Sequence, residues 1–155
     1  MAGGEQKPAQ SQVEFAQFGV VNFAPFTKVA AFAKGLSEGR IMATRCTGCG
    51  RLEFPPKADC PECSGKGFEW TAISGRGTLV TYTTIHSAPT GFEDRAPYTI
   101  GVVDLEEGGR LLSWVQGTPE AELRVGMPFM AHVERLPAAE AGKPDRFIYV
   151  LRRTE

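Results

Sequence analysis

Two pairs of cysteines constrain this chain more than any other feature of its sequence. Cys46-Thr-Gly-Cys49 and Cys60-Pro-Glu-Cys63 both have the CxxC spacing, and ten residues separate the pairs. Two such turns can point four thiolates at one ion, in the tetrahedron that zinc adopts in structural sites. A segment of about thirty residues cannot build a sufficient core of its own. The sequence therefore predicts that one zinc ion holds residues 41–72 together as a zinc ribbon.

The chemistry of this predicted site depends on its ligand set. Gly48 and Gly50 allow the backbone to turn inside and after the first pair. Four thiolates close the coordination shell, so no position is left for water or substrate, and the zinc is expected to be structural. A thioredoxin-like pair of redox dithiols would need a βαβ context, which the sequence lacks. Iron in a rubredoxin-type site uses the same ligands and stays an alternative, with zinc as the default occupant.

The composition bounds the class of protein. The chain has 155 residues, a formal net charge of −1, 42% hydrophobic and 23% charged residues, which suits one domain or one domain with a metal-bound appendage. The neutral balance gives no general attraction to nucleic acid. No apolar run is long enough to span a bilayer, and residues 1–12 lack the apolar core of a signal peptide. We therefore expect a cytoplasmic protein, and the cysteines agree, because such a cluster in a reducing compartment is more often a metal site than two disulfides.

Changes in residue pattern divide the chain into four parts. Residues 1–26 form an N-terminal extension, expected to be partly mobile, whose apolar second half is a candidate partner-docking segment. Residues 27–40 have the apolar spacing of a helix, with Thr27 as N-cap and Gly39 as the end. The zinc ribbon occupies residues 41–72, and a β-rich domain occupies residues 73–155.

The β-rich domain is predicted to be a barrel. It contains five short runs rich in β-branched and aromatic residues, separated by turn residues: Thr78–His86, Tyr98–Leu105, Arg110–Gln116, Met127–Leu136 and Arg146–Arg152. A longer link with a short helical turn before Leu123 joins the third and fourth runs. This arrangement fits a five-stranded Greek-key barrel of the OB type. An SH3-like barrel is the main alternative, because strand number does not fix topology. The expected fold class is thus mainly β, with a helix, a rubredoxin-like ribbon and an OB barrel.

No catalytic apparatus is recognised in the sequence. All the cysteines are assigned to the metal, and no motif surrounds His86 or His132 on the predicted strands. Nucleophile-elbow, P-loop and dinucleotide-binding motifs are absent. By itself the chain does not resemble an enzyme.

Short elements follow one another in a characteristic order over residues 32–152, although only the cysteines are specific individually. In chain order they are Phe32, Gly35-Leu36, Gly39-Arg40-Ile41, Arg45-Cys46, Cys49-Gly50, Pro55-Pro56, Cys60–Cys63, Trp70, Ser74–Leu79, Ala96–Tyr98, Val103–Leu105 and Val125–Met127. This series resembles a known family, the acyl-CoA-associated zinc-ribbon/OB-fold proteins that are small partners of thiolase-like enzymes.

The resemblance implies a non-catalytic subunit in a hetero-oligomer whose large, thiolase-like partner carries the chemistry. Within the family the chain is most similar to the small zinc-finger subunit of the benzoylsuccinyl-CoA thiolase of anaerobic toluene degradation. The resemblance also implies a place beside the coenzyme A channel. Arg45, Arg51 and Lys57 lie on the ribbon and are candidates for contacting the phosphates of coenzyme A, although solvated surface charge is an equally good interpretation.

Two other functions stay open at this level. Zinc ribbons and OB barrels also occur in single-stranded nucleic-acid-binding modules, and aromatic residues of the predicted strands could form a stacking platform: Tyr82, Tyr98, Trp114, Phe129, Phe147 and Tyr149. The net charge of −1 argues against this function. A free-standing electron carrier would require iron at the four cysteines.

Overall fold

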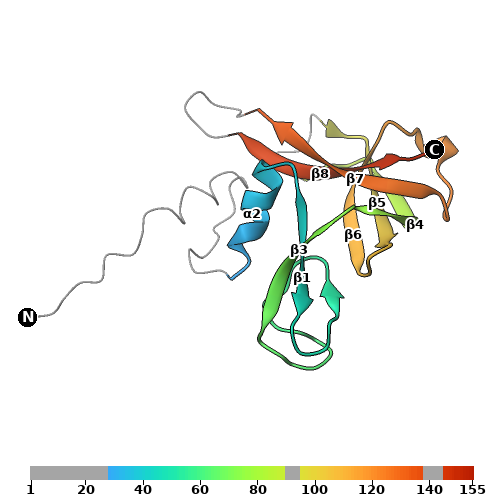
Figure 1. Ribbon diagram of the computed structural model, residues 1–155. Helices are drawn as coiled ribbons and strands as arrows, with labels where there is room; N and C mark the ends of the chain where they lie inside the picture. The colour runs from blue at the N-terminus through green and yellow to red at the C-terminus, as the bar shows by residue number, and fades with distance from the viewer. Residues whose placement is uncertain (1–27, 90–94, 138–144) are drawn as a thin grey trace, which may run out of the picture.

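The structure is a computed structural model that describes residues 28–89, 95–137 and 145–155. A short helix and a small three-stranded sheet precede a β-barrel (Figure 1). The predicted N-terminal extension and the predicted N-cap Thr27 lie outside the described residues. Among the described residues, no helix has the length and apolar character needed to cross a membrane.

Helix α2 (Ala30–Ser37) buries Ala33, Gly35 and Leu36 on one face. It is shorter than the predicted 27–40 and begins after Val29 without a side-chain cap. Gly39, with φ of +76°, follows its end, as predicted. A Cβ added to Gly35 would lie 2.5 Å from Cγ of Met42, so this glycine permits the close approach of the helix to the first strand.

The small sheet has the order β2–β1–β3 and is antiparallel throughout. Strands β1 (Ile41–Cys46) and β3 (Phe68–Ile73) pair along their full length, and β2 (Leu52–Glu53) adds a short edge. Thr44 is 1% exposed because its hydroxyl bonds both the N–H (2.9 Å) and the C=O (3.0 Å) of Lys57. This contact fixes the loop after β2 to the centre of the sheet.

The barrel is closed by five strands in the order β4–β5–β6–β8–β7. They are β4 (Arg76–Ile85), β5 (Tyr98–Leu105), β6 (Arg110–Gln116), β7 (Pro128–Leu136) and β8 (Arg146–Arg153). Strand β8 lies between β6 and β7, pairs in parallel with β6, and so makes the Greek-key order of an OB barrel. The OB prediction is confirmed over the SH3-like alternative. The predicted helical turn is the 3-10 helix Glu120–Glu122.

One hydrophobic core joins the helix, the small sheet and the barrel. Leu36 and Ile41 belong to the same buried cluster as Leu79 and Leu151 of the barrel. Phe54, which follows β2, is 4% exposed and contacts the β5–β6 turn, where a Cβ on Gly109 would lie 3.2 Å from the Phe54 nitrogen. The ribbon is therefore packed against the barrel and is not a separate flexible module.

Candidate metal centre

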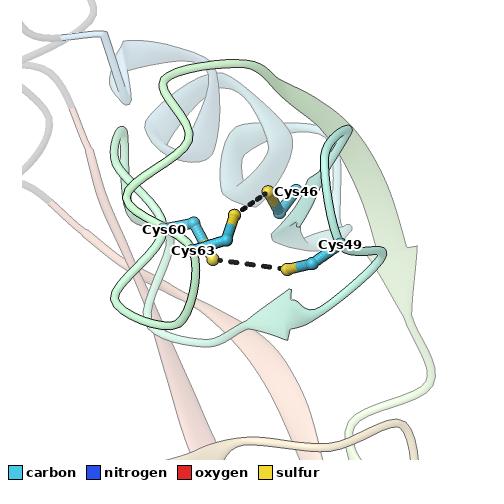
Figure 2. Close-up of side chains that lie close together, drawn as sticks. All are labelled: Cys46, Cys49, Cys60 and Cys63. Carbon is cyan, nitrogen blue, oxygen red and sulfur yellow. Dashed lines mark hydrogen bonds between the residues drawn. The ribbon is translucent and has the colours of Figure 1, made fainter.

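The four cysteine sulfurs converge on one point of the ribbon (Figure 2). Cys46 ends β1 and Cys49 lies in the turn that follows it, whereas Cys60 and Cys63 come from the connection between β2 and β3. The Sγ atoms of Cys46 and Cys63 are 3.5 Å apart, those of Cys49 and Cys60 are 3.6 Å apart, and all four lie within 4.8 Å of one another. The fold thus brings together the four cysteines that the sequence predicts as ligands of one ion.

This arrangement fits a tetrahedral ion. Zn–S bonds of about 2.3 Å give a tetrahedron with sulfur–sulfur edges of about 3.8 Å, close to the observed separations. No disulfide joins these cysteines. In the described ranges, no other group of three or more His, Cys, Asp and Glu side chains has metal-binding geometry. The donor set of four thiolates suits zinc or iron and leaves no open coordination position.

The two CxxC turns have the same backbone hydrogen bonds. The N–H of Cys46 donates to the C=O of Arg51, and that of Gly50 donates to the C=O of Cys46 (both 2.9 Å). The second turn repeats this pattern, with Cys60 donating to Gly65 and Ser64 donating to Cys60 (both 2.9 Å). The residue that directly follows each CxxC motif has a left-handed backbone, with φ of +77° at Gly50 and +55° at Ser64. The glycine is recognisable from the sequence as a turn position, whereas the serine is not.

The electrostatics of the four clustered thiols favour a cation. The N–H groups of Cys49 and Gly48 lower the pKa of Cys46 to about 7, from the usual 9.0. At Cys63 the N–H of Gly65 lowers the pKa, but the sulfurs of Cys46, Cys49 and Cys60 outweigh it and raise the pKa to about 12. The protein thus stabilises a first thiolate and resists the ionisation of further ones. A divalent ion removes this conflict, because it attracts all four negative charges.

Comparison with known families decides the affiliation of the chain. Residues 33–69 match the family model "ChsH2, rubredoxin-like zinc ribbon domain", and residues 70–134 match "ChsH2, C-terminal OB-fold domain". The chain belongs to the ChsH2 family of zinc-ribbon/OB-fold proteins. The four cysteines lie in the segment that matches the zinc ribbon, which supports a structural zinc ion.

Relatives of this ChsH2-family chain carry the names of scaffold proteins, thiolase subunits and hydratase alpha subunits. It is 36% identical over 97 residues to a "DUF35 domain-containing scaffold protein" of Methanocaldococcus jannaschii, covering 62% of this chain and 69% of the relative. It is also 36% identical over 100 residues to "Benzoylsuccinyl-CoA thiolase subunit BbsA" of Thauera aromatica, covering 58% of this chain and 68% of that protein. The solved "Ltp2-ChsH2(DUF35) aldolase" shares the fold, with a TM-score of 0.67, 24% identity, and coverage of 87% of this chain and 98% of the other.

The cationic residues suggested for coenzyme A are not equivalent in the structure. Arg51 and Lys57 converge on Glu53, with Arg51 Nε 2.7 Å from Oε1 and Lys57 Nζ 2.8 Å from Oε2. Arg51 also pairs with Glu62 at 2.6 Å. Arg45 instead donates to the C=O of Gly50 at 2.9 Å. The side chains of Arg51 and Lys57 are 51% and 48% exposed, so both still present charge to solvent.

Glu53 is the polar residue of this region that sequence analysis missed. Its side chain is 8% exposed, and the Arg51 contact to Oε1 is an ion pair without hydrogen-bond alignment. Burial raises its pKa, but Lys57 and Arg51 together outweigh burial and bring the pKa below its ordinary value. The sequence shows that Glu53 lies between Arg51 and Lys57. Its burial, which makes the two ion pairs significant, depends on the fold and cannot be read from the sequence.

The aromatic residues considered for nucleic-acid stacking do not share one face. Phe129 is 1% exposed in the core, and Tyr82, Phe147 and Tyr149 pack against that core. Tyr98 and Trp114 lie next to each other, with ring centroids 5.7 Å apart, and Arg95 lies 5.2 Å from the centroid of Trp114. Two neighbouring rings are a much smaller surface than the platform that the sequence suggested.

Proposed function

We propose that this chain is a non-catalytic, zinc-binding accessory subunit of an acyl-CoA thiolase complex. The observation that carries the proposal is the convergence of all four cysteines in one closed site, with Cys46, Cys49, Cys60 and Cys63 as ligands of a structural Zn²⁺ ion. A thiolase needs a free cysteine to carry the acyl group and a second residue to transfer protons. A chain whose every thiol is bound to zinc leaves that chemistry to a large partner.

The relatives support this division of roles. One carries the name of a thiolase subunit and another that of a scaffold protein, and both match at 36% identity. We propose that the partner is a thiolase-like chain in a hetero-oligomer and that the reaction is acyl transfer to coenzyme A. Benzoylsuccinyl-CoA, named in the Thauera aromatica relative, is the proposed acyl substrate.

We further propose that cationic side chains of the ribbon contact the phosphates of coenzyme A, at the edge of a site formed with the partner. Arg51 and Lys57 are held close together by Glu53, and both keep about half of their side chains exposed. Two adjacent cations with restrained positions suit the phosphates of a coenzyme. Arg45 is a third candidate, on the neighbouring strand β1.

Affinity purification of the full-length chain from its native cell tests the proposed function. The expected result is co-purification of a thiolase-sized protein, identified by mass, and thiolysis of benzoylsuccinyl-CoA by the complex but not by this chain alone. A chain that elutes alone, or with partners unrelated to acyl-CoA chemistry, would overturn the proposal. Activity with other 3-oxoacyl-CoA substrates but not with benzoylsuccinyl-CoA would correct only the substrate.

A further inference from the structure

Strand β7 is paired along both edges for only part of its length. It pairs with β8 from Phe129 to Leu136, whereas its pairing with β4 ends at Met130, opposite Arg76. The next contact on that side is the hydrogen bond from the N–H of Ala131 to the C=O of Gly75, at 2.9 Å. Beyond it the chain turns away into β3 and the zinc ribbon, so β7 continues without a neighbour on this edge (Figure 1).

The direction of the backbone groups follows from the hydrogen bonds already described. In an antiparallel pair, successive residues direct their N–H and C=O groups to opposite edges. Ala131 faces β4, and the C=O of Pro128 faces β8, where it accepts from the N–H of Thr154 at 3.1 Å. Odd-numbered residues of β7 therefore face away from β8. By this alternation Val133 and Arg135 present their N–H and C=O groups to the open edge, and no described residue pairs with them there.

A groove of about 240 Å³ lies beside this edge. Met130–Val133 form one wall, and side chains of alternating orientation all contribute, so the groove follows the edge of the strand and not one face. The opposite wall includes Ile41, Ile73 and Ser74, from the start of β1 and the end of β3. Arg40, Ser74 and His132 also line the groove, so its walls combine polar groups with the apolar side chains of Met130 and Val133.

We propose that this edge receives an extended segment of the catalytic partner, which adds a strand to β7 at Val133 and Arg135. The inference rests on the proposed function for the identity of the partner. Unpaired N–H and C=O groups of a strand edge are best matched by another backbone in the extended conformation. Because polar and apolar groups both line the groove, the side chains of this segment meet His132 and Ser74 as well as Met130. Main-chain bonds supply affinity, and the groove supplies selectivity.

A proline scan of the edge tests the pairing directly. Val133→Pro and Val133→Ala both remove the isopropyl group of valine. Only proline also removes the outward N–H, which takes no part in the β7–β8 ladder. We expect Val133→Pro to bind the partner about fivefold more weakly than Val133→Ala, the effect of about one hydrogen bond. The matched pair Arg135→Pro and Arg135→Ala should behave in the same way. Equal affinities within each pair of variants would overturn the inference.

Amide hydrogen exchange on the wild-type complex gives a second readout that needs no substitution. The amides of Val133 and Arg135 should exchange fast in the isolated full-length chain and at least tenfold more slowly in the co-purified complex. Fast exchange in an intact, active complex would overturn the inference and leave the proposed function standing. Failure to recover any acyl-CoA enzyme would overturn both.

Two other occupants are distinguished by the isolated chain. If both amides are already protected and residues 1–26 must be removed to expose them, the chain's own N-terminal residues occupy the edge. If protection rises with protein concentration together with dimer formation, a second copy occupies it. Either result would overturn the assignment to the catalytic partner.

Discussion

The rings of Phe54 and Tyr149 meet edge to face, with centroids 5.8 Å apart, and so join the zinc ribbon to the last strand of the barrel. Phe32 of helix α2 completes the cluster, at 6.1 Å from Phe54 and 6.2 Å from Tyr149. Helix, ribbon and barrel thus share one aromatic contact. Tyr149 is mostly buried, and this burial raises the pKa of its phenol. The position of the metal centre relative to the barrel depends on this cluster.

We expect Phe54→Ala to destabilise the protein by about 3–5 kcal/mol, because it removes a buried ring from a packed junction. Urea unfolding followed by circular dichroism would measure this change. Phe68→Ala is the matched control, since Phe68 is half-buried in the ribbon and pairs with Trp70 instead of the barrel. A loss for Phe54→Ala no larger than that for Phe68→Ala would contradict a joining role of the aromatic cluster.

The cysteine site predicts one colourless zinc ion per chain. Cys60→Ser removes one ligand and should abolish stoichiometric zinc, disorder the ribbon and weaken partner binding, because the metal supplies much of the folding energy of the ribbon. Metal analysis by mass spectrometry and the dispersed amide NMR signals of residues 41–72 would report these effects. Pro61→Ala changes an exposed non-ligand in the same turn and should keep its zinc. A red protein containing iron would assign the site to electron transfer.

Substitutions at the two left-handed turn positions, Gly50 and Ser64, should change the stability of the ribbon in opposite directions. Ser64→Gly should stabilise the ribbon by up to about 1 kcal/mol, because a side chain in the left-handed region is strained and glycine is not. Gly50→Ala should destabilise it by a similar amount for the same reason. Thermal unfolding of both variants in the zinc-loaded state would measure the difference. Equal Tm shifts in the same direction would contradict the shared turn geometry.

The coenzyme A proposal predicts a kinetic effect without a change in the metal. Lys57→Ala should raise the KM for coenzyme A of the assembled complex several-fold while zinc content and kcat stay unchanged, because a phosphate contact is lost. Arg110→Ala is a matched control, since Arg110 makes a similar exposed ion pair with Asp104 on the barrel. An unchanged KM in Lys57→Ala would remove Lys57 from the coenzyme site.

The barrel strands are predictable from the sequence because turn residues mark their ends. The runs Tyr98–Leu105 and Arg110–Gln116 have the predicted bounds, and the glycine-rich turn between them is the reason. The strands of the ribbon are not predictable in the same way. In β1 the neighbours Ala43 and Thr44 are 0% and 1% exposed, since both faces are covered, so the strand shows no alternation of apolar and polar residues.

The metal ligands are predictable because their spacing along the chain already encodes one tetrahedral site. The junction of Phe54 with Tyr149, the open edge at Val133 and the burial of Glu53 are not encoded in this local way. Each depends on how segments far apart in the sequence pack together. Local patterns therefore identify the chemistry of the site, whereas the surfaces that connect it to the barrel and to a partner emerge only from the fold.

The carboxylate of Glu53 predicts a pH dependence of stability. Its folded-state pKa is depressed by Lys57 and Arg51 despite its burial, so the unfolded chain binds its proton more tightly than the folded chain does. Its contribution is therefore complete above the unfolded pKa of about 4.3 and is lost as the pH falls through the lower, folded value.

Glu53→Gln tests this dependence. It should lower the free energy of unfolding at pH 7 by about 1–2 kcal/mol, a value reduced because Arg51 and Lys57 are half exposed. The difference between wild type and variant should shrink as the pH approaches 3. Urea unfolding at pH 7, 5, 4 and 3 would measure it, with Glu120→Gln on the exposed 3-10 helix as control. A difference that is constant across this range would show that the carboxylate stabilises the ribbon by shape alone and not by its charge.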